Sequence, residues 1–171
     1  MNETTIKSVG LKYGVLLGAA LIGFFLLIYI LDLAGNQTIQ WASYIFIIGA
    51  VFLAYREFKE GNDGFMSFGQ GLGGGMLTIG VGSVISSLFS YVFLKFLDPS
   101  YMQRIVDITR ERMEENPNLT EEQVEQAMES TMPFLTPEAI TIFGIVGTLI
   151  VGLIICLIMS AIMKKDAPEG V

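Results

Sequence analysis

The stretch GQGLGGGMLTIGVGSVISSLFSYVFL, residues 69–94, decides the fold of this chain. It opens with five glycines in seven residues, and Gly69, Gly71 and Gly74 have the G-x-G-x-x-G spacing with which dinucleotide-binding folds hold a pyrophosphate. That fingerprint needs a buried strand before the glycines and an acidic residue about 20 positions after them. Here a polar segment precedes the glycines, and no acidic residue follows them until Asp98. The sequence therefore argues against a nucleotide site, and the glycines need another explanation.

The same stretch belongs to one of four apolar runs whose interiors carry no charge. Hydrophobic residues make up 52% of the 171-residue chain and charged residues 16%, whereas a soluble domain usually carries about a quarter charged residues. A run of about 20 apolar residues is enough to cross the hydrocarbon core of a bilayer. We therefore expect an all-α, polytopic membrane protein that forms a single membrane domain over residues 1–171. Its four transmembrane helices are expected at about 11–33, 39–56, 68–96 and 137–163.

Three of these expected spans carry ridges of small residues at every fourth position. Helices in lipid gain little from the hydrophobic effect, so small residues are used to bring their backbones together. The residues that we expect in helix–helix contacts are Gly10, Gly14, Gly18, Gly71, Gly75, Gly82, Ser86, Gly144, Thr148 and Gly152. The glycine run at 69–75 lies at the start of the third span, and the sequence leaves open whether it is helical, unwound or re-entrant.

The ridges have a functional alternative, which is that they line a pore or a substrate path. Such paths usually contain a charge within the membrane or a helix that is broken around a binding site. No charged residue, histidine or proline lies in the interior of an expected span. Asp32 and Lys95 come nearest to an interior, and we expect them to form a structural ion pair at the outer boundary. The sequence therefore favours close packing, with a transport path as the alternative.

The net charge of the protein, −7, is concentrated between the third and fourth expected spans. Residues 98–138 contain ten acidic residues and three arginines, so this segment alone carries −7. Asp98-Pro99 is a favourable helix start, and Thr120 with Gln123 makes a capping box. Apolar residues at helical spacing follow each start. We expect an acidic helical hairpin over residues 98–135, at the mouth of the bundle.

Lysine and arginine counts indicate the orientation of the chain, because basic residues are enriched in the cytoplasmic flanks of membrane spans. Four basic residues flank the spans on the side of the acidic hairpin, and six flank them on the side of the termini. These six are Lys7, Lys12, Arg56, Lys59, Lys164 and Lys165. We therefore expect both termini in the cytoplasm and the hairpin outside.

Catalytic and metal-binding chemistry finds little support in the sequence. The chain has no histidine and a single cysteine, Cys156, so it lacks the usual ligand set of a zinc site. The carboxylates crowd into one polar segment without the alternating ligand spacing of a calcium-binding loop. We expect no catalytic, cofactor or metal site, no enzyme activity and no nucleic-acid partner.

Several short motifs along the chain resemble those of a known family. They are Leu11-Lys12-Tyr13-Gly14, Tyr55-Arg56-Glu57, the segment from Gly64 to Leu72, Asp98-Pro99-Ser100-Tyr101, and the terminal segment from Ile158 to Lys165. On these residues the chain resembles a bacterial family of small membrane proteins, the domain-of-unknown-function family numbered 4199. The resemblance spans nearly the whole chain. It implies four helices in a bacterial cytoplasmic (inner) membrane and no assigned activity.

Two functions stay open from the sequence. The first is a structural or accessory membrane protein whose hairpin at 98–135 binds a partner or senses the exterior. The second is a small transporter or channel lined by the small-residue ridges. Besides the lipid bilayer, a protein bound at the hairpin and a second copy of this chain are the candidate partners.

Overall fold

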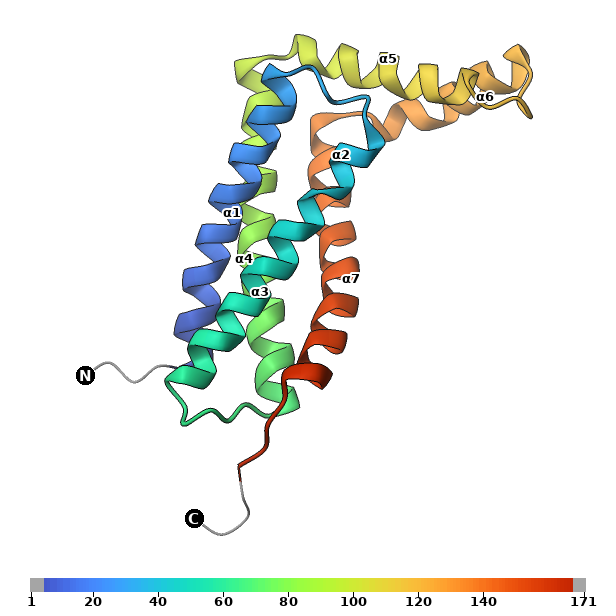
Figure 1. The fold of residues 1–171 in the computed structure, drawn as a ribbon. Coiled ribbons are helices and arrows are strands. Elements are labelled where there is room, and N and C mark those ends of the chain that lie inside the picture. The colour runs from blue at the N-terminus through green and yellow to red at the C-terminus, as the bar shows by residue number, and fades with distance from the viewer. Residues whose placement is uncertain (1–4, 168–171) are drawn as a thin grey trace.

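The computed structural model describes residues 5–167, and its fold is all-α (Figure 1). The elements are α1 (Ile6–Ile30), α2 (Gln37–Trp41), α3 (Ser43–Glu60), α4 (Phe68–Val92), the π-helix η1 (Phe93–Leu97), α5 (Ser100–Glu114), α6 (Glu121–Thr131), the 3-10 turn η2 (Met132–Phe134) and α7 (Pro137–Met163). Figure 1 shows α1, α3, α4 and α7 side by side as a bundle, while α5 and α6 run across one end of the bundle and extend beyond it. The outermost residues of the expected domain, 1–4 and 168–171, lie outside the described residues.

Three helical segments are long and apolar enough to cross a membrane, namely Ile6–Ile30, Phe68–Leu97 and Pro137–Met163. The first begins five residues before the expected span, because Thr5 and Ser8 form a capping box at its start. It ends at Ile30, before the expected boundary at residue 33. The second and third of these segments keep the predicted bounds to within a residue.

The second expected span, 39–56, corresponds to α2 followed by α3. Of the 18 residues of α3, four are charged: Arg56, Glu57, Lys59 and Glu60. Because these charges fill its last turns, α3 does not share the apolar composition of the three long helices, and a fourth span is not shown. It still packs within the bundle, against α1, α4 and α7.

The glycine run at 69–75 is helical, and it is neither unwound nor re-entrant. Ser67 and Gln70 form a capping box in which each side chain accepts the backbone N–H of the other residue. The first turns of α4 therefore begin on a well-formed helix start, and neighbouring side chains occupy the space beside the glycines.

Three glycines of this run make room for side chains of other elements. A Cβ atom added to Gly71 would lie 2.8 Å from Oγ of Ser160, which α7 contributes. One added to Gly75 would meet Oη of Tyr55 and would lie 2.6 Å from Sγ of Cys156. Gly74 in turn accommodates Ile6 of α1, whereas Gly69 and Gly73 would have nothing within 4 Å of an added Cβ. The first turns of α4 thus lack side chains at the positions where side chains of α1, α3 and α7 pack against them.

The closest approach of α1 to α4 also depends on glycine. The predicted packing residues in this interface are Gly10, Gly14, Gly18 and Gly82. A Cβ atom on Gly14 would lie only 2.6 Å from Cβ of Val81, and one on Gly82 would lie 2.8 Å from Cγ of Leu17. The two backbones therefore approach to a distance that no larger residue would allow.

The predicted ridge of small residues on α7, which includes Gly144, Thr148 and Gly152, contacts α4 over only part of its length. Gly152 faces Ile79, whose Cδ1 would lie 2.8 Å from an added Cβ. Gly144 is exposed and Thr148 is half-buried. The α4 side chain nearest to Gly144 is that of Ser87, whose Oγ would lie 3.8 Å from an added Cβ. The predicted packing residue Ser86 donates its hydroxyl to the carbonyl of Ser83 in its own helix. The tight contact between α4 and α7 therefore lies between the first half of α4 and the second half of α7. The sequence predicts that this end of the bundle is the cytoplasmic one.

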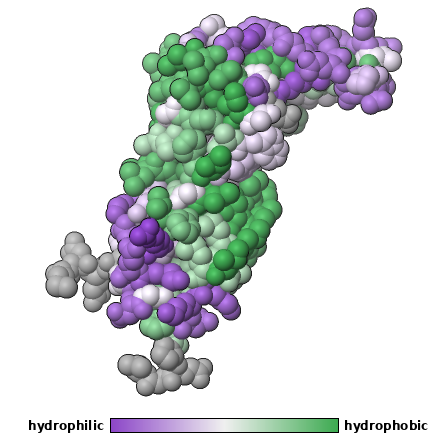
Figure 2. All heavy atoms as spheres, viewed as in Figure 1, coloured by the Kyte–Doolittle hydropathy of each residue, from purple (hydrophilic) through white to green (hydrophobic). Residues whose placement is uncertain are grey.

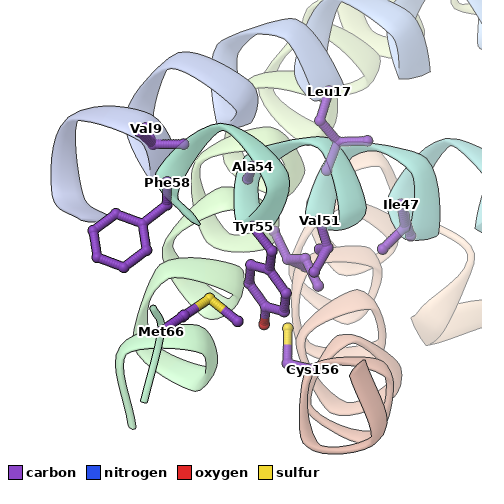
Figure 3. Close-up of a cluster of buried hydrophobic side chains, with 10 residues drawn as sticks. Val9, Leu17, Ile47, Val51, Ala54, Tyr55, Phe58, Met66 and Cys156 are labelled. Atoms are coloured by element: carbon purple, nitrogen blue, oxygen red, sulfur yellow. The ribbon is translucent and has the colours of Figure 1, made fainter. Parts of the chain in front are cut away.

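The main buried cluster joins α1, α3, α4 and α7 (Figure 3). Tyr55 of α3 is fully buried in it, and its hydroxyl lies 3.0 Å from Oγ of Ser160, which is also fully buried. Figure 3 shows the Tyr55 ring between Met66 and Cys156. Because buried polar groups are costly unless they are paired, this hydrogen bond stabilises the cluster.

The surface of the molecule is divided by polarity (Figure 2). Hydrophobic residues cover the middle of the bundle, and hydrophilic residues gather at its two ends and over the hairpin. Large apolar side chains are exposed in the middle band, among them Ile45, Ile150 and Ile154. Soluble monomers rarely expose apolar surface of this extent, so the distribution fits a bundle surrounded by lipid.

Candidate functional site: the acidic hairpin

The hairpin formed by α5 and α6 begins at Asp98, where η1 ends. The Asp98 carboxylate accepts a hydrogen bond from the hydroxyl of Ser100 and another, at 2.7 Å, from the hydroxyl of Tyr29 in α1. These bonds hold the pKa of Asp98 below its usual range, and the bond from Ser100 is the largest cause. The backbone carbonyl of Asp98 accepts the N–H of Tyr101 at 3.2 Å. The sequence predicts Asp98 as the N-cap of α5 and Pro99 as its first helical residue. Instead α5 begins at Ser100 and its N-cap is Pro99, without a side-chain cap bond, so Asp98 lies one residue before the cap.

Aromatic rings fix the start of α5 against the bundle. The ring centre of Tyr29 lies 4.8 Å from that of Phe93 and 5.1 Å from that of Tyr101, and both pairs meet edge to face. Phe25 and Phe89 extend this cluster along α1 and α4. Edge-to-face pairs add to the stability that ring burial already provides, so the orientation of α5 is set where it leaves the membrane helices.

Two polar contacts tie α5 to the connection between α1 and α2. Arg104 pairs with Asp32 at 3.1 Å, and an Nη atom of Arg112 lies 3.3 Å from the carbonyl oxygen of Gly35. Asp32 adopts a left-handed backbone conformation, with φ of 50°. The hairpin is therefore attached to both α4 and the end of α1.

The predicted ion pair between Asp32 and Lys95 is replaced by two other pairs. Asp32 binds Arg104, and Lys95 binds Glu138 at the start of α7 while it also donates to the hydroxyl of Tyr91. The reason is geometric, because α5 crosses the end of α1 and brings its own arginine to Asp32.

The two helices of the hairpin pack on each other through a small apolar face. Ile108 of α5 and Val124 and Met128 of α6 are buried. Arg110 pairs with Glu125 across the hairpin at 2.9 Å. The capping box predicted at the start of α6, between Thr120 and Gln123, is present. These contacts make the segment at 98–135 a folded hairpin rather than a loose loop.

The acidic side chains of the hairpin face solvent. Eight of its nine acidic residues are exposed, and only Asp98 is half-buried. The eight are Asp107, Glu111, Glu114, Glu115, Glu121, Glu122, Glu125 and Glu129. Each of its three arginines, Arg104, Arg110 and Arg112, donates to an oxygen atom of another residue, as described above. In Figure 2 the hairpin is a hydrophilic arm that projects sideways from the bundle. The arrangement gives a surface of negative charge on a folded hairpin.

A pocket of about 500 Å³ lies between the two hairpin helices, near their connection. It is lined by Arg110, Glu114, Leu119, Glu121, Val124 and Glu125. Within the part of the chain that the structure describes, no three carboxylate, cysteine or histidine groups are placed to hold a metal ion together. The chemistry of the pocket is that of charge and hydrogen bonding.

The length and composition of three helices, together with the apolar band on the surface, indicate a multi-pass membrane protein. Residues 12–165 match a protein family, and the chain belongs to the family described as "Protein of unknown function (DUF4199)". The match covers nearly the whole chain and confirms the resemblance seen in the short motifs. No curated protein and no solved structure matches the chain.

The sequence does not indicate the role of several residues that the structure brings together, both in the bundle and at the root of the hairpin, which is the region where Asp98 and α5 contact the ends of α1 and α4. Tyr29 and Glu138 lie at the ends of apolar helices, where a polar group next to a boundary gives no indication of its partner. Tyr55 belongs to a family motif, but nothing in that motif indicates that its hydroxyl is buried against Ser160. The only signal for Arg104 is its place one to two turns after Asp98 on an expected helix.

Proposed function

We propose that this protein is an accessory protein of the bacterial cytoplasmic membrane whose acidic hairpin binds a partner with a basic surface. In this proposal α3 crosses the membrane in addition to the three long helices. Both termini are then cytoplasmic, and the hairpin lies outside. The role is binding rather than catalysis. The observation that carries the proposal is a hairpin that ion pairs, hydrogen bonds and aromatic contacts attach to the bundle, with eight of its nine acidic side chains exposed.

The packing of α3 supports its assignment as a span. It lies alongside α1 and α4 over the height of the bundle (Figure 1). Ile45, Ile48 and Phe52 of α3 are exposed apolar side chains, as expected for a lipid-facing helix. Its charges are confined to 56–60, where Glu57 also accepts a hydrogen bond from Lys12 at 2.6 Å. That placement suits the headgroup region at the end of a span.

The charge of the hairpin supports a basic partner. A surface with one sign of charge raises the encounter rate with a surface of the opposite sign, and repels partners of the same sign. The contacts at the root keep this charge in a fixed orientation beside the bundle, so little ordering is required when a partner binds. A second copy of this chain would present the same negative surface, which makes it a poor partner at the hairpin itself.

The test is affinity purification of the full chain in mild detergent, with a hairpin variant whose charge is removed. Glu111, Glu114, Glu121, Glu122 and Glu129 are changed together to glutamine, while the ion-paired Glu125 is kept. A matched control changes the same five residues to aspartate and so keeps the charge. We expect recovery of co-purifying basic proteins to fall by roughly tenfold or more in the glutamine variant and to stay near wild type in the control. Equal recovery from the glutamine variant, or no specific partner from the wild type, would count against the proposal.

The alternative, a small transporter or channel lined by the glycine ridges, receives less support from the contacts. Gly71, Gly75 and Gly152 are covered by side chains of neighbouring helices, which is the arrangement that close packing requires. Reconstituted vesicles that contain the purified protein distinguish the two functions. Flux of ions or small solutes above that of empty vesicles, altered by Gly152→Leu in a protein that stays folded, would favour transport.

A further inference from the structure

A second feature lies at the opposite end of the bundle from the hairpin, between the ends of α3 and α7. It is an open pocket of about 250 Å³, lined by Phe52, Arg56, Lys59, Glu60, Gly64 and Met163. The pocket has an apolar wall, formed by Phe52 and Met163, and a polar wall, formed by the charged residues at the end of α3. The side chain of Phe52 is 46% exposed, so the apolar wall continues onto the surface that faces lipid.

The cations of this pocket are held in place by contacts that leave donors for a ligand. Arg56 pairs with Glu60 through its Nε atom at 2.8 Å, a bond that does not use the terminal Nη donors of the guanidinium. Lys59 donates to the carbonyl oxygen of Met163 at 3.0 Å, which accounts for one of its three ammonium hydrogens. Both cations are thus fixed at the rim of the pocket.

A third cation, Lys165, lies beside the pocket in the segment after α7. Its backbone forms a two-bond bridge with Met66, each bond 2.9 Å long. Its ammonium lies 5.1 Å from the ring centre of Phe65, and a Cβ atom added to Gly64 would stand 3.9 Å from its Nζ. Two cations, Arg56 and Lys59, line the pocket together with one carboxylate, that of Glu60, and the ammonium of Lys165 lies next to the pocket beside Gly64.

We propose that this pocket binds the headgroup of an anionic phospholipid from the cytoplasmic leaflet. An occupant must present a negative charge to Arg56, Lys59 and Lys165 and an apolar chain to Phe52 and Met163. It must also be present at the level where the helices leave the membrane. Anionic phospholipids meet all three conditions, and basic pockets between membrane helices are a recurring site for such headgroups. The proposal rests on the membrane insertion and orientation proposed above, but not on the role of the hairpin.

The experiment is native mass spectrometry of the purified full chain in detergent, titrated with phosphatidylglycerol or with phosphatidylcholine of the same acyl chains. Arg56→Gln and Lys165→Gln each remove one cation of the pocket. Lys7→Gln is the matched control, because it removes one cation from the same side of the bundle and away from the pocket. Lys59 is left unchanged, since it also caps α7. Glycerol phosphate serves as a competitor that carries the headgroup charge without acyl chains.

We expect wild type and the Lys7→Gln control to bind phosphatidylglycerol more tightly than phosphatidylcholine. The apparent Kd for phosphatidylglycerol is expected to rise roughly fivefold in each pocket variant, with no change in thermal unfolding. Glycerol phosphate should not displace the lipid. Equal binding of the two lipids by the wild type, or equal loss in the control and the pocket variants, overturns the proposal. Displacement of the lipid by glycerol phosphate would assign the pocket to a soluble phosphate compound and overturn it as well. A protein that binds phosphatidylglycerol as predicted but captures no partner at the hairpin would contradict only the proposed function.

Discussion

Tyr55 reaches its buried position because α4 has no side chain at Gly75. The Tyr55 ring crosses from α3 into the bundle, and its hydroxyl meets Ser160 of α7 beside that glycine. One missing Cβ therefore allows three helices to meet at one point. The neighbouring Gly73 has the same residue type on the same helix, but open space beside it.

This difference makes a matched pair of substitutions. Gly75→Ala places a methyl group against Tyr55 and Cys156, and we expect it to lower the free energy of unfolding by about 1–3 kcal/mol. Gly73→Ala adds the same methyl group where nothing lies within 4 Å, so its effect should stay within about 0.5 kcal/mol. Thermal unfolding followed by circular dichroism in detergent measures both. Equal destabilisation by the two variants would show that the contact at Gly75 is not the reason for the glycine.

At the scale of single residues, the sequence predicts which residues are small but not which way they face. The ridges at every fourth position indicate that helices approach each other closely. Whether a given ridge faces a helix or lipid depends on the rotation of that helix, which its neighbours determine. Gly75 and Gly144 both belong to predicted ridges, yet Gly75 is buried and Gly144 is exposed.

Among the elements, α5 shows how a hairpin is attached to a membrane bundle. Its start is hydrogen-bonded to Asp98 through Ser100, packed against Tyr29 through Tyr101, and tied to Asp32 through Arg104. The sequence predicts the two hairpin helices because caps and apolar spacing are local properties. It does not predict the partners of Asp32 and Lys95, because those depend on the direction in which α5 leaves η1.

The pKa of Asp98 gives the attachment a dependence on pH. The folded-state pKa is depressed below the unfolded value of about 3.9. The ionised carboxylate therefore stabilises the root of α5 fully above that value, and this contribution is lost as the pH falls through the lower, folded-state pKa. We expect amide hydrogens in the first turns of α5 to exchange faster, relative to those of α4, as the pH falls below about 4.

Hydrogen exchange of the full chain in detergent, measured by mass spectrometry across this pH range, provides the test. Asp98→Asn cannot ionise, so its α5 should exchange faster than wild type at neutral pH and should show a weaker dependence on pH. A wild-type and an Asp98→Asn protein with the same exchange profile at every pH would contradict the assigned role of the carboxylate.

At the scale of the whole molecule, polarity separates three zones, which are an end with charges of both signs, an apolar middle and an acidic hairpin. Composition predicts this division, because apolar runs of spanning length and a concentrated net charge are visible in the chain itself. The number of spans is harder to predict. The charges at 56–60 make α3 shorter in its apolar part than α1, α4 and α7, so its place in the membrane depends on its packing in the bundle.

The account as a whole depends on α3 crossing the membrane, because that crossing determines on which side the hairpin lies. With four spans and cytoplasmic termini, α2 and the hairpin are outside and the connection between α3 and α4 is inside. If α3 does not cross while the start of α1 stays cytoplasmic, that connection lies outside and the hairpin lies inside. The two arrangements thus predict opposite sides for the same two positions.

Cysteine labelling in intact cells tests this most directly. Single cysteines are placed at exposed positions, Thr38 in α2, Gly61 after α3 and Asn118 in the hairpin, in a protein whose native Cys156 is replaced by serine. The account predicts that a membrane-impermeant thiol reagent labels Thr38→Cys and Asn118→Cys in intact cells, and labels Gly61→Cys only after the membrane is permeabilised. Labelling of Gly61→Cys in intact cells, with Asn118→Cys protected, would contradict it.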